Sequence, residues 1–385
     1  MKILYLMTEP FGIGGVQSDL LILSEGLARR GHEVAVATTD GELLDELTAR
    51  GAVFVDIDFR FRHPLRLLRA MLALRRAVAA QAPDVVAPQS VRSAIVAFLA
   101  LRPIGLRRRG PSPRARLPIV TTIHNIHNPR NFKWAGRILR LCSDFVIFES
   151  NYERDRLLAA GLDARRSRVI HSGIDIARLG RPGDIGVLAR NYGLDPDGHL
   201  IYGIVARLSE EKGHRYLIEA FARVAARKEH ARLLVIGDGP LLDAVRQQVQ
   251  ALGLSQRVVL AGTQRDIATH LALLHVFVLA STRESFPLSA REAMAAATPV
   301  VAPRIGGCPE VVEDRVTGLL FESANIDDLA DKLLQLADPA LQRAMGDAGR
   351  ERALRLFSHD AWVAGDEQVY LEFAGRVTGP AGAAA

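Results

Sequence analysis

Short apolar runs alternate with amphipathic helical patterns along the first half of the chain, as they do in parallel α/β sheets. Strands are predicted at residues 2–8, 33–38, 53–57, 84–87, 119–123 and 144–149, and helices at 16–30 and 65–80. The second half repeats the theme, with predicted strands at 200–205, 233–236, 258–261, 276–279 and 300–302 and helices at 215–227, 239–251, 289–297 and 359–373. The pattern predicts an α/β protein made of two similar halves.

A chain of 385 residues is too long for one ordinary core, so we expect two domains. The segment 176–198 holds several Gly, Pro and Asp residues and is the expected linker between an N-terminal domain, 1–175, and a C-terminal domain, 199–358. A helix at 359–378 follows, which could pack back on the N-terminal domain. The Gly/Ala tail, 379–385, is expected to be disordered.

Cysteine usage and hydropathy indicate the compartment. Cys142 and Cys308 form neither a disulfide framework nor a metal-binding pattern, which suits a reducing cytoplasm. The first apolar run is too short for a secretory signal, and nowhere do 18 apolar residues run unbroken. We therefore expect a cytoplasmic protein, with peripheral binding to the inner face of the membrane as an option.

Positive charge is concentrated in one segment of the N-terminal half. Residues 59–143 contain 17 Lys or Arg and one acid, whereas the whole chain carries +6, so the remaining residues sum to −10. A helical wheel of the predicted helix places its arginines opposite a leucine-rich side; they are Arg62, Arg66, Arg69 and Arg76. A basic loop adds five more arginines, Arg107, Arg108, Arg109, Arg114 and Arg116. This face could meet an anionic membrane or another anion, or it could be a solvated surface; no nucleic acid partner is expected.

A glycine loop between the first predicted strand and helix contains Gly14 and Gly15. Glycines there let a ligand approach the backbone, and the helix N-terminus offers free N–H groups to a phosphate. The spacing lacks the third glycine of a dinucleotide fingerprint, although Asp40 follows the second strand where a ribose-binding acid would stand. On its own the loop could also be no more than a tight turn.

Two cations follow the first predicted strand of the second half. Arg207 and Lys212 precede a helix, where together they could neutralise a diphosphate leaving group that gains charge as a glycosidic bond breaks. They could also be surface cations paired with Glu210 and Glu211.

Two glutamates lie eight residues apart around the start of a later helix. Glu284 falls in a loop after a predicted strand, where α/β sheets bind ligands, and Glu292 falls on the following helix. The loop between them contains Ser285, Phe286, Pro287 and Leu288. Glu292 could accept hydrogen bonds from ribose hydroxyls, or it could be a solvated helix residue.

His124 directly follows a predicted strand, with His127 three residues on. A histidine at the carboxyl end of a strand can touch substrate, but it can also be structural. Asp56 and Asp58 form a D-x-D sequence that could hold a divalent metal on a sugar-nucleotide diphosphate. Because this sequence lies far along the chain from the cation pair, we assign no metal ligand.

Together these motifs resemble the retaining glycosyltransferases of family 4, which have the GT-B fold. The resemblance spans almost the whole chain and rests on seven segments: Gly14-Gly15, Ile123-His124, 169–175, Arg207 with Lys212, 237–240, Glu284 to Glu292, and 312–318. An E-x7-E element with an upstream R-x4-K is its most specific part. The resemblance implies two Rossmann-like domains facing each other across a cleft, in which the N-terminal domain binds the acceptor and the C-terminal domain the donor.

The resemblance also implies a role for each residue. Arg207 and Lys212 correspond to the pair that binds the donor diphosphate, Glu284 to the contact with the donor sugar and Glu292 to the contact with the ribose. His124 would face the donor sugar, and Gly15 would place an amide near the phosphates. The expected donor-binding set is Gly14, Gly15, Arg207, Lys212, Ser285, Phe286, Pro287, Leu288 and Glu292, and the expected catalytic set is His124, Glu284, Arg207 and Lys212. The family needs neither a metal nor another cofactor.

Two positions depart from the family pattern. Pro287 stands where a glycine usually follows the phenylalanine, which removes an N–H and stiffens the loop. Ser172 stands where an asparagine is usual. Neither change removes a charged group, so activity is still expected.

The sequence thus predicts a metal-independent, retaining transferase that moves a sugar from a nucleotide-diphosphate sugar to a hydroxyl of a glycan or lipid-linked acceptor. Three alternatives remain: an NAD-dependent oxidoreductase, a non-catalytic sugar-nucleotide-binding subunit and a GT-B-fold epimerase. The missing third glycine, the intact set of charged residues and the E-x7-E element, respectively, argue against them.

Overall fold

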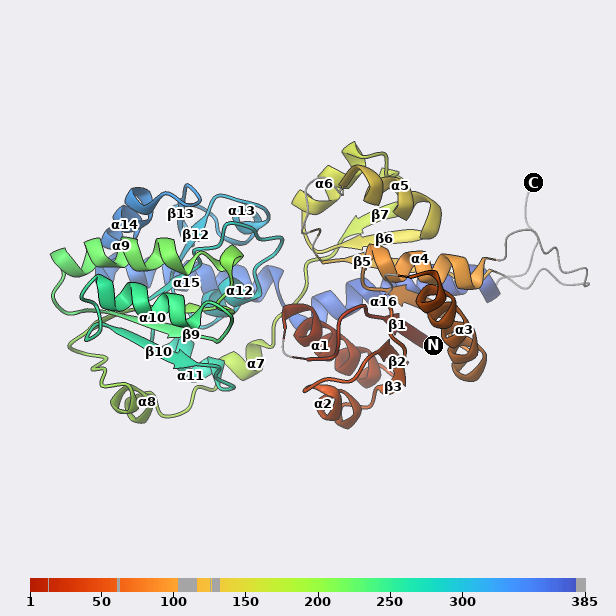
Figure 1. The fold of residues 1–385 in the computed structure, drawn as a ribbon, viewed down its shortest axis with the longest axis horizontal. Coiled ribbons are helices and arrows are strands. Elements are labelled where there is room, and N and C mark those ends of the chain that lie inside the picture. Colours follow the sequence, from red (N-terminus) through yellow and green to blue (C-terminus); the bar gives the residue numbers. More distant parts are fainter. Residues whose placement is uncertain (13, 61–62, 103–115, 125, 127–131, 379–385) are drawn as a thin grey trace, which may run out of the picture. The chain divides into compact units, whose positions relative to one another are not determined.

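The chain folds into two compact units, and the computed structural model describes residues 1–12, 14–60, 63–102, 116–124, 126 and 132–378 (Figure 1). Unit 1 comprises Met1–Gly173 together with helix α16 (His359–Thr378), and unit 2 is Ile174–Ser358. Each unit is a parallel sheet between two layers of helices, which is the arrangement that buries both faces of such a sheet.

The strands of unit 1 form two parallel sheets in the orders β3-β2-β1-β4 and β5-β6-β7. Their bounds are β1 Lys2–Leu6, β2 Glu33–Thr38, β3 Val53–Asp56, β4 Val85–Pro88, β5 Val120–Ile123, β6 Phe145–Phe148 and β7 Ser167–Val169. A parallel bridge between Val86 and Ile119 joins the sheets, so the combined strand order reverses direction between β1 and β4. Such a reversal is called a switch point. In doubly wound sheets, ligands bind at the carboxyl ends of the strands next to it.

Helices cover both faces of this sheet. One face is covered by α1 Gly15–Arg29, α2 Leu44–Ala49 and α16, and the other by α3 Pro64–Gln81, α4 Val91–Leu101, α5 Phe132–Cys142 and α6 Asn151–Ala159. Successive side chains of β1 point to opposite faces of the sheet. Tyr5 packs in the core beneath α1 and α16, whereas Leu4 packs beneath α3 and α4.

Unit 2 is a six-stranded parallel sheet in the order β10-β9-β8-β11-β12-β13. Its strands are β8 Leu200–Val205, β9 Ala231–Ile236, β10 Val258–Gly262, β11 Val276–Val278, β12 Val300–Pro303 and β13 Gly318–Phe321. The direction of winding reverses between β8 and β11. Unit 2 therefore has the same kind of switch point as unit 1.

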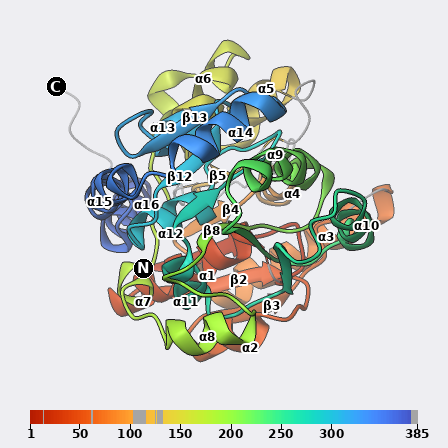
Figure 2. The ribbon, with the colours of Figure 1, turned by 90° about the vertical axis from the view of Figure 1, so that its left-hand side faces the viewer.

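The helices of unit 2 also form two layers, one on each face of the sheet (Figure 2). One layer consists of α9 His214–Arg227, α10 Leu242–Ala251 and α14 Ile326–Gln335. The other contains α7 Ile176–Leu179, α8 Ile185–Asn191, α11 Ile267–Leu273, α12 Leu288–Ala295 and α13 Cys308–Val311, and α15 Pro339–Leu356 packs against α12.

Two features differ from the sequence prediction. The expected linker, 176–198, instead contains α7 and α8 and belongs to unit 2, because Leu179 and Ala189 are buried in its core. Short helices with few apolar positions give little periodic signal, and for that reason this segment resembled a linker. Several longer helices, including α4, α5, α14 and α15, were also not predicted. The basic loop arginines from Arg107 to Arg114 and the tail 379–385 lie outside the described residues.

The helix predicted at 65–80 is α3, but its apolar side is only partly covered. Leu74 is fully buried, whereas Leu65, Leu68 and Leu72 are exposed by 72%, 50% and 43%. These three leucines recur at helical spacing and form one exposed stripe. Among the described residues, no helix is long and apolar enough to cross a membrane.

Candidate functional site

Except for Glu292, which lies in the second turn of α12, the predicted site residues lie after the carboxyl ends of strands or at the helix starts that follow them. In unit 2, Arg207 and Lys212 follow β8 and Glu284 follows β11, so they stand on the two sides of the switch point. In unit 1, Gly14 follows β1 and His124 follows β5. This placement could be predicted from the order of strands and motifs in the sequence, because parallel strands have their carboxyl ends at the same edge of the sheet.

A short ion pair links the two motifs of unit 2. The Nζ atom of Lys212 lies 2.6 Å from Oε1 of Glu284, and Ser281 donates a hydrogen bond of 2.7 Å to the same carboxylate oxygen. The Glu284 side chain is only 10% exposed, so this pair is shielded from water on most sides. Arg207 is exposed and has no ion pair with any described residue, which leaves its guanidinium group available to an anion.

Two glycines hold the loops that carry this pair. Gly306 has φ +54°, and a Cβ atom there would lie 1.7 Å from the carbonyl oxygen of Glu284. Gly213 has φ +67°, and its Cβ would lie 2.0 Å from the carbonyl oxygen of Ala280. No other residue type fits such contacts without moving the backbone, so these glycines fix where Glu284 and Lys212 stand.

The loop after Glu284 leads into α12, and a buried arginine of that helix, Arg291, packs against the loop. Pro287 is the N-cap of α12 and offers no side-chain acceptor, so the first amides of the helix donate no hydrogen bond to the cap side chain. Arg291 is fully buried; its guanidinium carbon lies 4.5 Å from the Phe286 ring centre and its nitrogens reach the carbonyl oxygens of Phe286 and Pro287. Sequence analysis missed Arg291, since a helical arginine is usually solvated.

Glu292 is partly buried rather than solvated. Burial raises the pKa of its carboxyl group to about 7, against the smaller opposing effect of Arg291 and Arg178. A carboxyl group with this pKa exists in both protonation states near neutral pH, so it can accept or donate a hydrogen bond to a hydroxyl. Its surroundings favour the ligand-binding interpretation over a solvated helix residue.

The glycine loop of unit 1 starts a helix that lacks a side-chain cap. Gly14 is the N-cap residue of α1 with extended backbone, and the helix begins at Gly15. An added Cβ on Gly15 would meet no atom within 4 Å, so there is open space at the helix start. The first amides of α1 can therefore meet a ligand. Asp40, by contrast, accepts a hydrogen bond from the adjacent Gly41 amide.

His124 is held by two oxygen atoms, one on each ring nitrogen. Its Nδ1 lies 2.8 Å from Oε1 of Glu149, and its Nε2 lies 2.8 Å from Oε1 of Gln89. The amide nitrogen of Gln89 donates to the carbonyl oxygen of Ala87, which fixes the amide with its oxygen toward His124. Both ring nitrogens must therefore carry protons, and His124 is an imidazolium cation. His127 lies outside the described residues.

The pKa of His124 agrees with this geometry. Burial lowers it, but the negative charge and hydrogen bond of Glu149 outweigh burial, with further help from Asp19, so that the pKa is raised above its usual value. The ligand atoms of Asp19, His124 and Glu149 lie within 4.8 Å of one another, as metal ligands can. A metal ion would need an imidazole nitrogen without a proton, so this cluster is built to hold protons.

A second buried acid faces this cluster from α16. Both carboxylate oxygens of Asp366 lack a hydrogen-bond partner among the described residues. Burial, followed by the negative charge of Glu149, raises the pKa of Asp366 to about 8, so this group is neutral at neutral pH. Sequence analysis found none of Gln89, Glu149 and Asp366. Gln89 and Glu149 follow β4 and β6 directly, as His124 follows β5, and this position is the signal that could have found them.

The structure also shows where the other predicted residues lie. Ser285, Phe286 and Pro287 are buried and Leu288 begins α12. Asp58 of the D-x-D sequence is paired with Arg60, Oδ1 to Nε at 2.9 Å, and Arg60 lowers the pKa of Asp58. The structure therefore brings Lys212 together with Glu284 in unit 2, and in unit 1 it joins His124 to residues that were not predicted.

Two family models match the chain, one on each half. "Glycosyltransferase Family 4" matches residues 13–178, and "Glycosyl transferases group 1" matches residues 190–352. Among solved structures, the chain is similar to a glycosyltransferase from Rickettsia africae ESF-5, with 21% identity, TM-score 0.82 and coverage of 97% of this chain and 98% of the other. It is also similar to Anabaena HepE in complex with UDP and glucose, with 24% identity, TM-score 0.81 and coverage of 96% and 99%. These likenesses show the GT-B fold.

Curated relatives are glycosyltransferases too. The chain is 33% identical to N-acetyl-alpha-D-glucosaminyl L-malate synthase of Bacillus anthracis over 190 residues, which cover 49% of each chain. It is 30% identical over 259 residues to the GDP-mannose-dependent alpha-(1-6)-phosphatidylinositol monomannoside mannosyltransferase of Mycobacterium tuberculosis strain H37Rv, covering 62% of this chain and 67% of the relative. The matches thus span between half and two thirds of these relatives, and the oxidoreductase alternative gains no support. The chain belongs to glycosyltransferase family 4.

Proposed function

We propose that this protein transfers a sugar from a nucleotide-diphosphate sugar to a hydroxyl group, with retention of the anomeric configuration. The observation that carries this proposal is the Lys212–Glu284 pair at the switch point of unit 2, with the unpaired Arg207 on the same loop as Lys212. A cation next to a carboxylate suits a ligand that presents phosphate oxygens beside sugar hydroxyls. The similar Anabaena protein, which was solved in complex with UDP and glucose, supports this ligand class.

In this proposal the cations and helix amides stabilise the leaving group. Arg207 and Lys212 neutralise the diphosphate as the glycosidic bond breaks, and the uncapped start of α12 adds amide dipoles. Glu284 accepts hydrogen bonds from the donor sugar, and Glu292 holds the ribose. Because protein cations supply the positive charge, no metal or other cofactor is required, and excess EDTA should leave the rate nearly unchanged. Loss of activity restored by magnesium or manganese would contradict this part.

The state of His124 restricts the proton transfer. An imidazolium ion with both nitrogens bonded to acceptors cannot take a proton from the acceptor hydroxyl. We assign that proton to an oxygen of the departing phosphate, which attack on the same face of the sugar brings close to the hydroxyl. His124 then contributes a fixed positive charge, and Glu149 and Gln89 are positioning residues that keep it charged.

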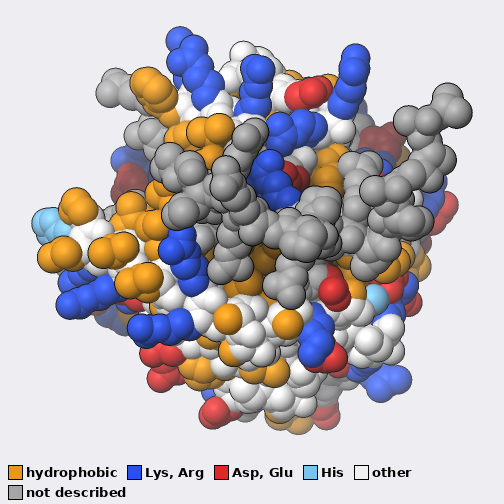
Figure 3. All heavy atoms as spheres, turned by 90° about the vertical axis from the view of Figure 1, so that its right-hand side faces the viewer, with side chains coloured by type: hydrophobic (Ala, Val, Ile, Leu, Met, Phe, Trp, Pro, Cys, Tyr) orange, Lys and Arg blue, Asp and Glu red, His pale blue; other side chains and the backbone are white. Residues whose placement is uncertain are grey.

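We further propose that α3 binds an anionic membrane surface at which a lipid-linked acceptor is met. The exposed stripe of Leu65, Leu68 and Leu72 offers apolar side chains to a lipid interface, and Arg66, Arg69 and Arg76 lie on the same helix. Figure 3 shows hydrophobic and basic side chains next to one another on the right-hand face of Figure 1. The mycobacterial relative is named for a phosphatidylinositol monomannoside, which fits an acceptor of this kind.

A panel of nucleotide sugars tests the central proposal. The full chain is incubated with each donor, and release of the nucleoside diphosphate is measured with and without candidate acceptors. Hydrolysis or transfer of one donor, abolished in Lys212→Ala, is the expected result. If no nucleotide sugar binds or reacts, while the chain still binds a nicotinamide cofactor, the proposal is wrong.

A further inference from the structure

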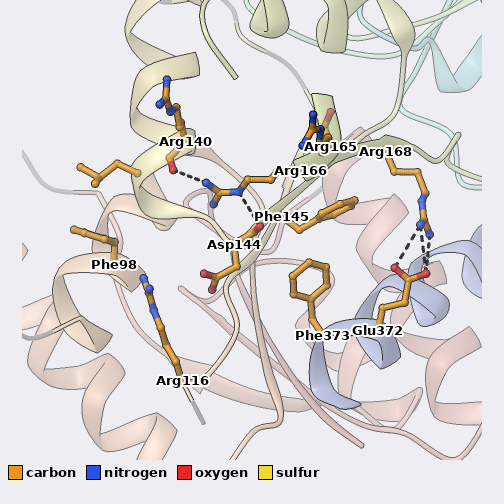
Figure 4. A pocket seen from close by; sticks show the side chains of 12 residues that line it. Phe98, Arg116, Arg140, Asp144, Phe145, Arg165, Arg166, Arg168, Glu372 and Phe373 are labelled. Atoms are coloured by element: carbon orange, nitrogen blue, oxygen red, sulfur yellow. Dashed lines mark hydrogen bonds and ion pairs between the residues drawn. The ribbon is translucent and has the colours of Figure 1, made fainter. Parts of the chain in front are cut away.

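A pocket of about 860 Å³ lies in unit 1 at the amino-terminal ends of β5, β6 and β7 (Figure 4). Arg116 precedes β5, Asp144 directly precedes β6, and Arg165 precedes β7. Because these strands are parallel, His124 and Glu149 lie at the opposite edge, a strand length of roughly 13 Å away. The pocket is therefore separate from the candidate site.

Arginines dominate the wall of this pocket. Five of its lining residues are arginines and two are acids; they are Arg116, Arg140, Arg165, Arg166, Arg168, Asp144 and Glu372. The lining therefore carries a net charge of +3. Like charges gathered around a hollow repel one another, so the free protein holds them there at some cost in stability.

Both acids of the pocket, Asp144 and Glu372, already have partners. Oδ2 of Asp144 accepts from NH2 of Arg102 at 2.6 Å and from the Ile119 amide at 2.9 Å. Glu372 is paired with Arg168 at 3.3 Å.

Arg166 is committed to the backbone, donating from Nε to the carbonyl oxygen of Asp144 at 3.2 Å and from NH1 to that of Arg140 at 3.0 Å. The guanidinium groups of Arg116, Arg140 and Arg165 are exposed and have no carboxylate partner among the described residues. Three arginines without a carboxylate partner thus stand around the pocket, with Arg116 at one end and Arg140 and Arg165 at the other (Figure 4).

The pocket also has an apolar part. Phe145 and Phe373 pack with ring centres 5.2 Å apart on one side, and Phe98 lies on the other side of Asp144 and Arg166 (Figure 4), where Leu141 also lines the pocket. Leu141 is 65% exposed. A hollow of this size is large enough for a small molecule, and its aromatic rings offer apolar contacts beside the charged groups.

We propose that this arginine pocket is a second ligand site, which binds a phosphate monoester or diphosphate attached to an apolar group. Guanidinium groups bind phosphate oxygens in pairs of parallel hydrogen bonds, and a lining with a net charge of +3 suits a doubly charged phosphate better than a single carboxylate. The aromatic side receives the apolar group. The ligand is either a phospholipid headgroup or a soluble phosphorylated compound, and both present the same chemistry.

The proposal can be tested by calorimetry, which measures the binding of short-chain phosphatidic acid below its micelle concentration. The background is the full chain carrying Arg207→Ala and Lys212→Ala, so that the other cation pair cannot bind the probe and failure of the proposed function does not affect the result. We expect saturable binding, weakened roughly tenfold or more by the triple change Arg116→Ser, Arg140→Ser and Arg165→Ser. All three side chains are exposed, so the variant should fold.

A matched control removes the same charge elsewhere. The triple change Arg190→Ser, Arg227→Ser and Arg343→Ser replaces three exposed arginines of unit 2, and it should leave the affinity within about twofold. Equal loss in both triple variants, or no loss in either, would overturn the proposal, because binding would then follow net charge or lie elsewhere.

Two further probes distinguish the source of the phosphate. Phosphatidylcholine vesicles with phosphatidic acid, but not without it, should retain the protein through the same three arginines if the ligand is a membrane lipid. Binding of short-chain phosphatidic acid but not of these vesicles supports a soluble ligand. If inorganic phosphate binds as tightly as short-chain phosphatidic acid, the assigned role of Phe145 and Phe373 is wrong.

Discussion

Lys212 and Glu284, which are 72 residues apart in the sequence, meet at 2.6 Å between Nζ and Oε1 at the switch point of unit 2. The partner of Lys212 is thus neither Glu210 nor Glu211, the acids next to it in the chain. This pairing fixes the position of the Lys212 side chain in the site. It also couples the group expected to bind the diphosphate to the group expected to bind the sugar.

Lys212→Ala should lower turnover by at least about 100-fold, or about 2.7 kcal/mol of activation free energy, because the leaving diphosphate loses a cation. Circular dichroism should show an unchanged fold, since Glu284 keeps its hydrogen bond from Ser281. The control is Lys228→Ala, at the end of α9, which should retain normal turnover. Near-normal turnover in Lys212→Ala would rule out the assigned role.

Glu149→Gln should lower kcat roughly tenfold at pH 7.5, because a neutral amide no longer keeps the His124 ring protonated. In the parent protein the pKa of His124 is raised and both of its ring nitrogens lie against oxygen acceptors, so kcat at saturating donor should change little when the pH falls from 7.5 to 6. In the variant the pKa of His124 falls, and lower pH should restore part of the rate.

The pH–rate profile and the NMR titration of His124 together check this prediction. Glu149→Asp keeps the negative charge and should retain more activity than Glu149→Gln. Identical pH–rate profiles in the parent and in Glu149→Gln would show that Glu149 only supports the structure.

Asp366→Asn should make stability less dependent on pH. The pKa of Asp366 is about 8 in the folded protein and near 3.8 when unfolded, so the folded state binds one more proton between these values. Stability must then fall as pH rises from about 4 to about 8, by at most about 1.4 kcal/mol per pH unit from this group. Urea unfolding across this range should show a shallower decline in Asp366→Asn.

Asp360→Asn provides the control for this measurement, because Asp360 lies on the same helix but is 93% exposed. Its stability should follow the parent protein at every pH. An equally steep decline in Asp366→Asn would show that the buried acid is not the source of the pH dependence.

Glu292→Gln should raise the KM for the donor, with a smaller effect on the KM for the acceptor. Because burial raises the pKa of Glu292 to about 7, the donor KM of the parent protein should also change between pH 6 and pH 8. Glutamine cannot titrate, so the variant should lose that part of the pH dependence. Initial rates over both substrates provide the measurement, and an effect confined to the acceptor would overturn the assignment.

The full chain should co-sediment with phosphatidylcholine vesicles that contain phosphatidylglycerol, but not with pure phosphatidylcholine, at low salt. Arg66→Ser, Arg69→Ser and Arg76→Ser together should abolish this binding, since basic residues near an anionic surface contribute on the order of 1 kcal/mol each. Replacing the exposed stripe, Leu65, Leu68 and Leu72, by serine should weaken binding and make it more sensitive to salt.

The control for the leucine variant changes three exposed leucines of unit 2 to serine: Leu252, Leu341 and Leu354. Sedimentation of this control should match the parent chain. If the unchanged protein does not bind anionic vesicles at low salt, the membrane proposal fails and a soluble acceptor is favoured.

Sequence analysis predicted the parallel α/β units and the residues that follow strands, because buried parallel strands are short apolar runs and their carboxyl ends collect ligand-binding loops. It could not predict Asp366, which reaches the His124 cluster from α16 more than 200 residues later in the chain. Nor could it say which leucines of α3 are covered. A wide apolar arc shows that a helix packs, but not how much of that arc its neighbours reach.

Helix α16 fills the core of unit 1, where Trp362, Val363 and Tyr370 are buried and the Tyr370 ring packs 6.2 Å from that of Tyr5. On the ribosome, the strands of unit 1 emerge first, yet the helix that closes their apolar face is made only after all of unit 2. Unit 2 is continuous in sequence and can fold while unit 1 still exposes that face. During synthesis, unit 1 is therefore the part of the chain that chaperones must protect.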